Sequence, residues 1–289
     1  MAAALIRSTP LLLTGLAVAL AFRAGIWNIG AEGQFYAGAV AAAWIGTRWP
    51  LHSPFLMLPV IGLGAGLAGA LWAAAPALLR ALGVLEVITT IMLNFVAEHL
   101  VGFLVQGPLQ ESAHTYPQTD PVAGAARLAP LVPGTRLSWA FPLAVLLALA
   151  LWVFLARTRA GFSLRVTGAN PVAARIAGRI RVTRVTTTAF LVSGAIAGLA
   201  GAAEVCGVTF ALYERLSPGY GYTAIAVALL AGLHPLWIIV SAVFFGALEA
   251  GAAALQRSAG FPSVTVYAIE AAIILCLALG KRVVRRADA

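Results

Sequence analysis

IWNIGAEGQF, residues 26–35, is the stretch that decides the fold, because it interrupts an apolar run with two amides, a carboxylate and two glycines. Its polar residues are Asn28, Glu32 and Gln34. Gly30 and Gly33 weaken a helix at this point. In a bilayer, a carboxylate costs about 3 kcal/mol, and non-helical backbone is tolerated only where protein buries it or it lines a cavity. We therefore expect a broken helix, which either lines a substrate path or forms a hydrogen-bonded network between packed helices.

The composition around this stretch is that of a membrane protein. The chain has 289 residues, of which 61% are hydrophobic and 10% charged, whereas a soluble domain has about 25% charged residues. Apolar runs long enough for a bilayer, which needs ~20 residues, occur at 54–79, 84–105, 139–156, 182–203, 235–255 and 263–280. Shorter segments at 10–25, 32–49 and 219–233 complete the series. We predict one all-α domain, 1–289, a polytopic transmembrane helix bundle of about 8–10 spans with short or broken helices.

The charge distribution predicts how the bundle is oriented. Of the 19 basic residues, seven lie between Arg157 and Arg184, where the sequence has no acid. Cytoplasmic loops carry such an excess, so we expect 157–181 in the cytoplasm and the long polar loop 106–138 outside. Counting segments then places the N-terminus outside. The net charge of +9 does not predict nucleic-acid binding, because the basic blocks lack interleaved aromatic residues.

A second polar stripe follows in EVITTIMLNF, residues 86–95. Glu86, Thr89, Thr90 and Asn94 recur at helical spacing and share one face. A polar stripe on a spanning helix faces the interior of the bundle, which means either a pore or hydrogen bonds between helices. The adjacent pair Glu98-His99 near the outer end of this segment is typical of local stabilisation.

The cytoplasmic loop contains GANPVAARIAG, residues 168–178. Asn170 is a good N-cap, Pro171 fits a first helical turn, and Gly178 can end the helix. The pattern predicts a helix of about two turns with Val172 and Ile176 on one face. This helix is either an ordinary loop helix or a docking element for a soluble partner.

Small residues also predict how the helices pack. Gly62-x-x-x-Gly66 and Gly194-x-x-x-Gly198 place glycines on one face of their segments. In lipid, such faces let two helix backbones approach closely.

Motifs for catalysis are missing from the sequence. The chain has one lysine, Lys281, and no G-x-x-x-x-G-K-[ST], so it forms no P-loop. H-E-x-x-H and G-x-S-x-G are also absent, and no metal-ligand spacing occurs. We therefore expect no metal, no cofactor and no enzymatic activity of this chain by itself.

Five stretches together resemble the permease subunits of bacterial ABC importers for nucleosides and simple sugars, in the branched-chain amino acid and ribose permease superfamily. In order they are NIGAEGQ, EVITTIMLN, GANPVAARIAG, SGAIAGLAGA and YTAIAVALL. The resemblance covers most of the chain, from about Pro10 to Gln256, and is greatest for nucleoside-type permeases. Family members usually have another span before the stretch that resembles TPLLLTGLAVALAFRAG, residues 9–25, and this would account for the outside N-terminus.

The resemblance implies a multi-pass permease in the bacterial cytoplasmic membrane, embedded in the lipid bilayer. Its partners would be a cytoplasmic ABC ATPase, a second permease subunit that completes a heterodimer, and an extracytoplasmic substrate-binding lipoprotein. The ATPase would dock on the coupling helix, with residues Asn170, Pro171, Ala173, Ala174, Arg175 and Gly178. The substrate path would include or border Asn28, Glu32, Gln34, Glu86 and Asn94, with Thr89 in the same polar stripe.

The amide and hydroxyl groups with few fixed charges favour a neutral, hydroxyl-rich solute, either a nucleoside or a simple sugar. The alternative is an ion- or proton-coupled secondary transporter or a channel. That alternative would use carboxylates in apolar segments, namely Glu32, Glu86, Glu204, Glu249 and Glu270. The two mechanisms differ in whether uptake requires ATP hydrolysis by a partner.

Overall fold

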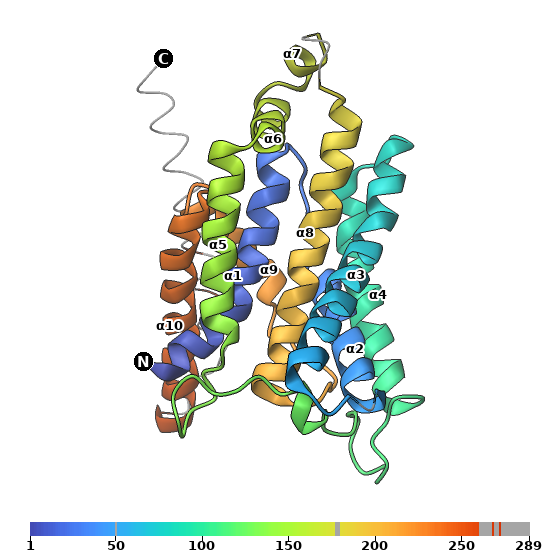
Figure 1. The fold of residues 1–289 in the computed structure, drawn as a ribbon, viewed down its shortest axis with the longest axis vertical. Coiled ribbons are helices and arrows are strands. Elements are labelled where there is room, and N and C mark those ends of the chain that lie inside the picture. The colour runs from blue at the N-terminus through green and yellow to red at the C-terminus, as the bar shows by residue number, and fades with distance from the viewer. Residues whose placement is uncertain (50, 177–179, 260–267, 269–271, 273–289) are drawn as a thin grey trace.

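The computed structural model describes residues 1–49, 51–176 and 180–259, together with 268 and 272. The described part is an α-helical bundle (Figure 1). Its long helices are α1 (Ala2–Arg23), α2 (Ala31–Arg48), α3 (Pro54–Ala81), α4 (Glu86–Gln106), α5 (Ala140–Arg157), α8 (Val182–Glu204) and α10 (Pro235–Ala259). Shorter helices are α6 (Arg159–Ala169), α7 (Pro171–Ile176), α9 (Tyr220–Leu230), a 3₁₀ turn η1 (Gly124–Ala126) and a π-helical turn η2 (Val205–Thr209) that extends α8.

Six helices in the described ranges are long and apolar enough to cross a membrane, which confirms the prediction of a polytopic all-α bundle. They are α1, α3, α4, α5, α8 with η2, and α10. Every predicted segment before residue 260 corresponds to a helix, but α2 and α9 are not among the six. The predicted segment 263–280 falls almost wholly outside the described residues.

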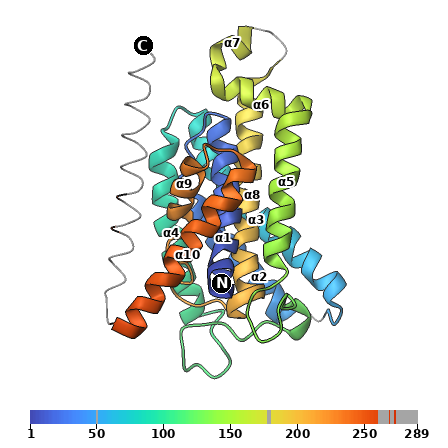
Figure 2. The same cartoon turned by 90° about the vertical axis from the view of Figure 1, so that its left-hand side faces the viewer.

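The two ends of the bundle differ in charge and structure. One end carries α6 and α7, which lie within the acid-free stretch 157–184, and we call it the basic end. The other end carries the loop 106–138, and we call it the loop end. Figures 1 and 2 show α7 at the tip of the basic end, with the N-terminus near the loop end.

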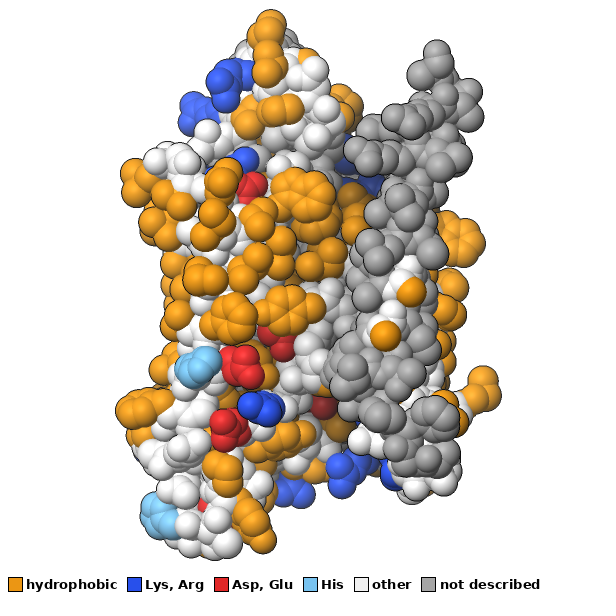
Figure 3. Space-filling model, turned by 180° about the vertical axis from the view of Figure 1, so that it is seen from behind, with side chains coloured by type: hydrophobic (Ala, Val, Ile, Leu, Met, Phe, Trp, Pro, Cys, Tyr) orange, Lys and Arg blue, Asp and Glu red, His pale blue; other side chains and the backbone are white. Residues whose placement is uncertain are grey.

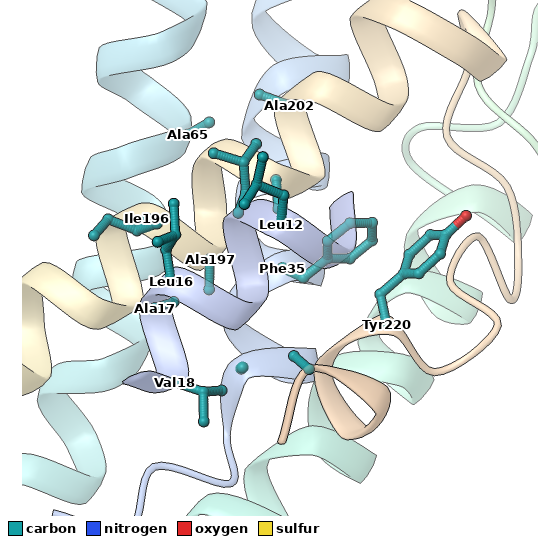
Figure 4. Close-up of a cluster of buried hydrophobic side chains, with 14 of the residues drawn as sticks. Leu12, Leu16, Ala17, Val18, Phe35, Ala65, Ile196, Ala197, Ala202 and Tyr220 are labelled. Atoms are coloured by element: carbon teal, nitrogen blue, oxygen red, sulfur yellow. The ribbon is translucent and has the colours of Figure 1, made fainter. Parts of the chain in front are cut away.

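The core surrounds α8, which packs against α1, α2 and α3. At two crossings the backbones are almost in contact. A β-carbon added to Gly38 of α2 would overlap the backbone of Gly198, and one added to Gly194 would overlap Gly69 of α3. Figure 4 shows the apolar side chains that fill the space between these helices, including Leu12, Phe35 and Ile196.

The predicted small-residue face on 194–198 is confirmed, but the one on α3 lies elsewhere. Gly69, rather than Gly62 or Gly66, makes the close approach to α8, because β-carbons at 62 and 66 would be in ordinary contact at 3.8 Å or more. The sequence motif thus predicted correctly that α3 packs closely against another helix, but it placed the contact at the wrong helical turn.

Two helices, α2 and α9, begin inside the bundle rather than at an end. Residues 24–30 lead inward from the basic end, where Arg23 Nε donates to the Leu233 carbonyl at 2.7 Å, and α2 then runs to the loop end. Residues 210–219 lead inward from the loop end, and α9 then runs to the basic end. Gly221 of α9 packs against the backbone of Glu32, so the two N-termini meet. Because α9 has 11 residues and so spans about 16 Å, this junction lies at roughly mid-depth.

Candidate substrate path and docking helix

The break before α2 is held by a buried network of amide groups. Asn28 Nδ2 donates to Gln34 Oε1 at 2.9 Å, and Gln34 Nε2 donates to Asn28 Oδ1 at 3.1 Å. Asn28 Nδ2 also donates to Ser193 Oγ of α8 at 2.9 Å, while the Gly30 N–H donates to Asn28 Oδ1 at 3.0 Å. Asn28 is 0% and Gln34 1% exposed. The amides therefore replace the hydrogen bonds that the broken helix lacks, as buried backbone in a membrane requires.

Glu32 joins the two half-helices. Its Oε2 accepts the backbone N–H of Gly221 at 2.6 Å, and the residue is 5% exposed. It lies in the first turn of α2 and caps the first turn of α9. Negative charge is stabilised at the positive end of a helix dipole, and here two such ends converge on one carboxylate.

Asn94 connects α4 to the same junction. Its Oδ1 accepts the Gly33 N–H at 2.8 Å, and its Nδ2 donates to the Ile29 carbonyl at 2.9 Å and to the Tyr222 hydroxyl at 3.2 Å. Asn94 is 2% exposed. We refer to Asn28, Glu32, Gln34, Asn94 and Ser193 as the polar seam, because together they bind α2, α4, α8 and α9 at mid-depth.

The other predicted residues of α4 lie nearer the basic end. Glu86 Oε2 is 3.6 Å from Arg80 Nε. Thr89 donates to the Glu86 carbonyl of its own helix at 3.0 Å, and Thr90, which is fully buried, does the same at 2.7 Å. The stripe thus divides: Asn94 belongs to the seam, Thr90 lies beside Gly30 at the helix break, and Glu86 pairs with the end of α3.

A different set of polar side chains is open to the outside of the subunit. Figure 3 shows acidic, basic and histidine side chains gathered below the middle of a face that is mostly apolar above them. The structure leaves Glu98 and His99 of α4, Glu214 and Arg215 of the inward-leading segment, and Tyr222 of α9 exposed or partly exposed. We call these five residues the open strip.

The members of the open strip come together through the fold. Gln106 Nε2 donates to Glu214 Oε2 at 3.3 Å, and Gly102 lies beside the same carboxylate, so residues 213–215 run along α4. Glu98 precedes the end of α4 by eight residues, which places it about 12 Å inward along the helix.

The open strip contrasts with the outer faces of α3 and α5. Their exposed side chains are leucines and other apolar residues, such as Leu63, Leu67, Leu143 and Leu146. Each of these helices has one charged residue, at its end nearest the basic end: Arg80 in α3 and Arg157 in α5. Those faces suit lipid, whereas charged groups at membrane depth face water, protein or one another.

Sequence reasoning singled out part of the open strip and missed the rest. The pair Glu98-His99 is typical of local stabilisation, and His99 Nδ1 does lie 2.8 Å from the Phe95 carbonyl of the same helix. No helical or strand periodicity in the sequence marks Glu214, Arg215 or Tyr222 as a member of a polar face. The sequence offered one signal for these residues. The glycines that flank α9 indicate that the chain reverses its direction before this helix.

Helix α7 forms the outermost part of the basic end (Figure 2). Asn170 Oδ1 accepts the N–H groups of Val172 and Ala173, both at 3.0 Å, which confirms the predicted N-cap. Val172 is 64% and Ile176 80% exposed, and Arg175 is exposed beside them. Ala174 is fully buried and faces inward. The predicted helix end at Gly178 lies outside the described residues.

The chain was compared with known proteins. Residues 1–278 match the family described as "Branched-chain amino acid transport system / permease component". A glucose ABC transporter permease of Haloferax volcanii is 40% identical over 284 residues, covering 94% of this chain and 74% of the relative. A guanosine ABC transporter permease of Bacillus subtilis is 36% identical, covering 93% and 78%. A nucleoside ABC transporter permease of Lactococcus lactis is 31% identical, covering 93% and 76%.

Family membership also fixes the division of labour. The relatives carry the name of permease subunits, which transport and leave ATP hydrolysis to a partner chain. The chain thus belongs to the branched-chain amino acid transport system permease family, as a multi-pass permease subunit of an ABC importer in the cytoplasmic membrane.

Proposed function

We propose that this permease moves a nucleoside or a simple sugar along a path lined by the open strip. The observation that carries the proposal is that the five exposed or partly exposed side chains of the open strip reach from the loop end of α4, where Gln106 donates to Glu214, inward to the seam, where Asn94 donates to Tyr222. Carboxylates, a histidine and an arginine can exchange hydrogen bonds with the hydroxyl groups of a neutral solute. The Tyr222 ring adds an aromatic surface for a base or sugar ring. The names of the relatives support the same substrate class.

The sequence-predicted path residues take supporting places in this proposal. Asn28 and Gln34 hold the helix break, and Glu32 fixes α9 against α2. Asn94 orients the Tyr222 hydroxyl through a bond of 3.2 Å. Glu86 and Thr89 lie toward the basic end, where the path would leave the membrane. In this proposal the seam lies beside the path and holds in place the helices that line it.

The orientation follows from the charges. By the positive-inside rule, the basic end faces the cytoplasm and the loop end faces the outside. A substrate-binding lipoprotein would then meet the loop 106–138. A second permease would face the open strip and close the path on its other side. A heterodimer fits this arrangement, because the relatives include pairs of different permeases from one organism.

The coupling element in this proposal is α7. An exposed apolar pair, Val172 and Ile176, with Arg175 beside it, forms a knob at the cytoplasmic tip. Asn170 and Pro171 start the helix and Ala174 anchors it, while Ala173 lies on the exposed side. The knob would transmit ATP-driven movement from the ABC ATPase.

Reconstituted transport tests the function. The permease would be placed in vesicles with its second permease, ATPase and binding protein, and uptake of labelled nucleoside and sugar would be measured with and without ATP. We expect uptake that stops when the Walker lysine of the ATPase is replaced. Uptake driven by a pH gradient without ATP would instead support a proton-coupled carrier.

The coupling role is tested by Arg175→Glu. We expect the variant to insert normally and to lose most of its co-purification with the ATPase. Arg136→Glu, which reverses a charge at the loop end, serves as the matched control. Equal recovery of the ATPase with both variants would reject the docking role of α7.

A further inference from the structure

Two apolar pockets lie between α5 and α8 on the face away from the open strip. Both helices pack against α1, which forms the floor. The pocket nearer the basic end has a volume of about 490 Å³ and is lined by Leu20, Phe154, Val192 and neighbouring apolar residues. The pocket nearer the loop end has a volume of about 420 Å³ and is lined by Leu13, Leu143 and Leu199 among others.

The first pocket differs from the second in its polar rim. Arg184 of α8, Ser163 of α6 and Thr188 of α8 line it, and the side chains of Arg184 and Thr188 are exposed. Among the described residues, no charged side chain lines the second pocket. Helix α6 crosses the basic end of the bundle (Figure 2), and three of its residues line the first pocket. The arginine thus lies where the apolar groove meets the membrane surface.

The charge around this rim has one sign. The stretch from Arg157 to Arg184 has no acid, and both α6 and the start of α8 belong to it. Phe162 on α6 is 56% exposed, which suits a helix lying at the interface between lipid and water. A ligand for this groove needs an apolar tail for its walls and an anionic group for Arg184.

We propose that the groove between α5, α6 and α8 binds one acidic glycerophospholipid from the cytoplasmic leaflet. Its phosphate pairs with Arg184, which can donate two parallel hydrogen bonds to phosphate oxygens. Its acyl chains lie along Leu20, Phe154 and Val192. The lipid bridges α5 and α8 beside the coupling helix, so it would stiffen the segment that carries α7. The leaflet, though not the groove, rests on the orientation proposed above.

Lipid binding is measured by native mass spectrometry of the full chain in detergent, with phosphatidylglycerol or phosphatidylcholine added. We expect one phosphatidylglycerol to be retained in preference to phosphatidylcholine. Arg184→Gln should lower this preference about fivefold, which is the effect of one basic residue at an anionic surface. Arg175→Gln removes the same charge outside the groove and should leave the preference unchanged.

A second variant tests the groove independently of charge. Ala160→Trp fills its exposed mouth and should reduce phosphatidylglycerol binding while all arginines remain. Equal retention of the two lipids, or equal effects of Arg184→Gln and Arg175→Gln, would overturn the proposal. A cross-link from position 160 to the second permease in the assembled transporter would also overturn it, because a protein would then occupy the groove. None of these readouts depends on transport.

Discussion

The polar seam and the open strip are both polar regions of an otherwise apolar bundle, yet they are built differently. In the seam, Asn28 and Gln34 are 0% and 1% exposed and bond to each other. In the strip, His99, Glu214 and Arg215 are exposed on the outer surface of the subunit. Polar residues in an apolar sequence can therefore hold a broken backbone, as in the seam, or stay available to a solute, as proposed for the strip. Burial and hydrogen-bond partners distinguish the two.

The largest expected effect is at the junction of the two half-helices. In Gly221→Ala, the added β-carbon would lie 2.2 Å from the Glu32 backbone nitrogen, so α2 and α9 must separate. We expect a loss of at least ~3 kcal/mol in the free energy of unfolding, seen as a lower thermal midpoint in detergent and poor recovery of folded protein. Gly251→Ala is the control, because nothing lies within 4 Å of its added carbon. Equal stability of the two variants would show that the close contact between α2 and α9 does not stabilise the fold.

A somewhat smaller effect is expected within the seam itself. Asn28→Leu keeps a similar volume but leaves the Gln34 amide and the Gly30 N–H without their partner. Unpaired buried polar groups cost about 1–3 kcal/mol each, and at the lower figure the two groups give a loss of about 2 kcal/mol. Gln106→Leu, at the edge of the open strip, should change stability by less than about 0.5 kcal/mol. Thermal unfolding of both variants checks the difference.

The open strip should show the opposite behaviour. Glu98→Gln and Glu214→Gln should leave the unfolding midpoint unchanged and lower uptake about tenfold, because a hydrogen bond to a charged group is worth about 1.5 kcal/mol or more. Leu67→Ala on the exposed face of α3 should alter neither quantity. If the two glutamine variants unfolded earlier and transported normally, the strip would be structural instead.

The loop end provides an aqueous reference with the smallest expected effect. The Glu111 carboxylate accepts hydrogen bonds from Gln118 Nε2 at 2.6 Å and from the Tyr116 N–H at 2.9 Å, and these bonds lower the pKa of Glu111. Because the folded pKa is lowered, the bonds stabilise the loop fully above the ordinary glutamate pKa of about 4.3 and are lost as the pH falls through the lowered value.

Hydrogen exchange at the Tyr116 amide, corrected for the intrinsic rate, measures this loss. Protection should be constant near neutral pH and fall only in acid. Glu111→Gln keeps an acceptor oxygen but does not titrate, so its protection should not change over the same range. Loss of protection near neutral pH would contradict the assignment.

Local features of the fold could be predicted from the sequence. The break at residues 26–35, the N-cap at Asn170 and the apolar segments before residue 260 depend on neighbouring residues, and each is present in the described part of the chain. Spacing also placed Asn94 and Thr90 on one face of α4, and both are buried. It could not show that Asn94 bonds Gly33 and Tyr222, because those partners lie 61 and 128 positions away.

Contacts between residues far apart in the sequence could not be predicted. Glu249 had no visible partner in the sequence, and the structure places its Oε2 3.4 Å from Arg7 Nη1. The open strip likewise depends on residues 213–215 returning along α4. Helical spacing tells which side chains share a face, but not which other segment that face meets. The roles of the seam and the docking helix stay predictions for this reason.

Water accessibility tests the central distinction most directly. In the assembled transporter, with Cys206 and Cys276 replaced by alanine, single cysteines at His99, Tyr222, Ser193 and Leu67 would be treated with a membrane-impermeant maleimide. We expect the maleimide to label His99→Cys and Tyr222→Cys, with the transported solute suppressing the labelling, and to leave Ser193→Cys and Leu67→Cys unlabelled. Labelling of Ser193→Cys together with unreactive His99→Cys and Tyr222→Cys would contradict it, because the path would then run through the seam.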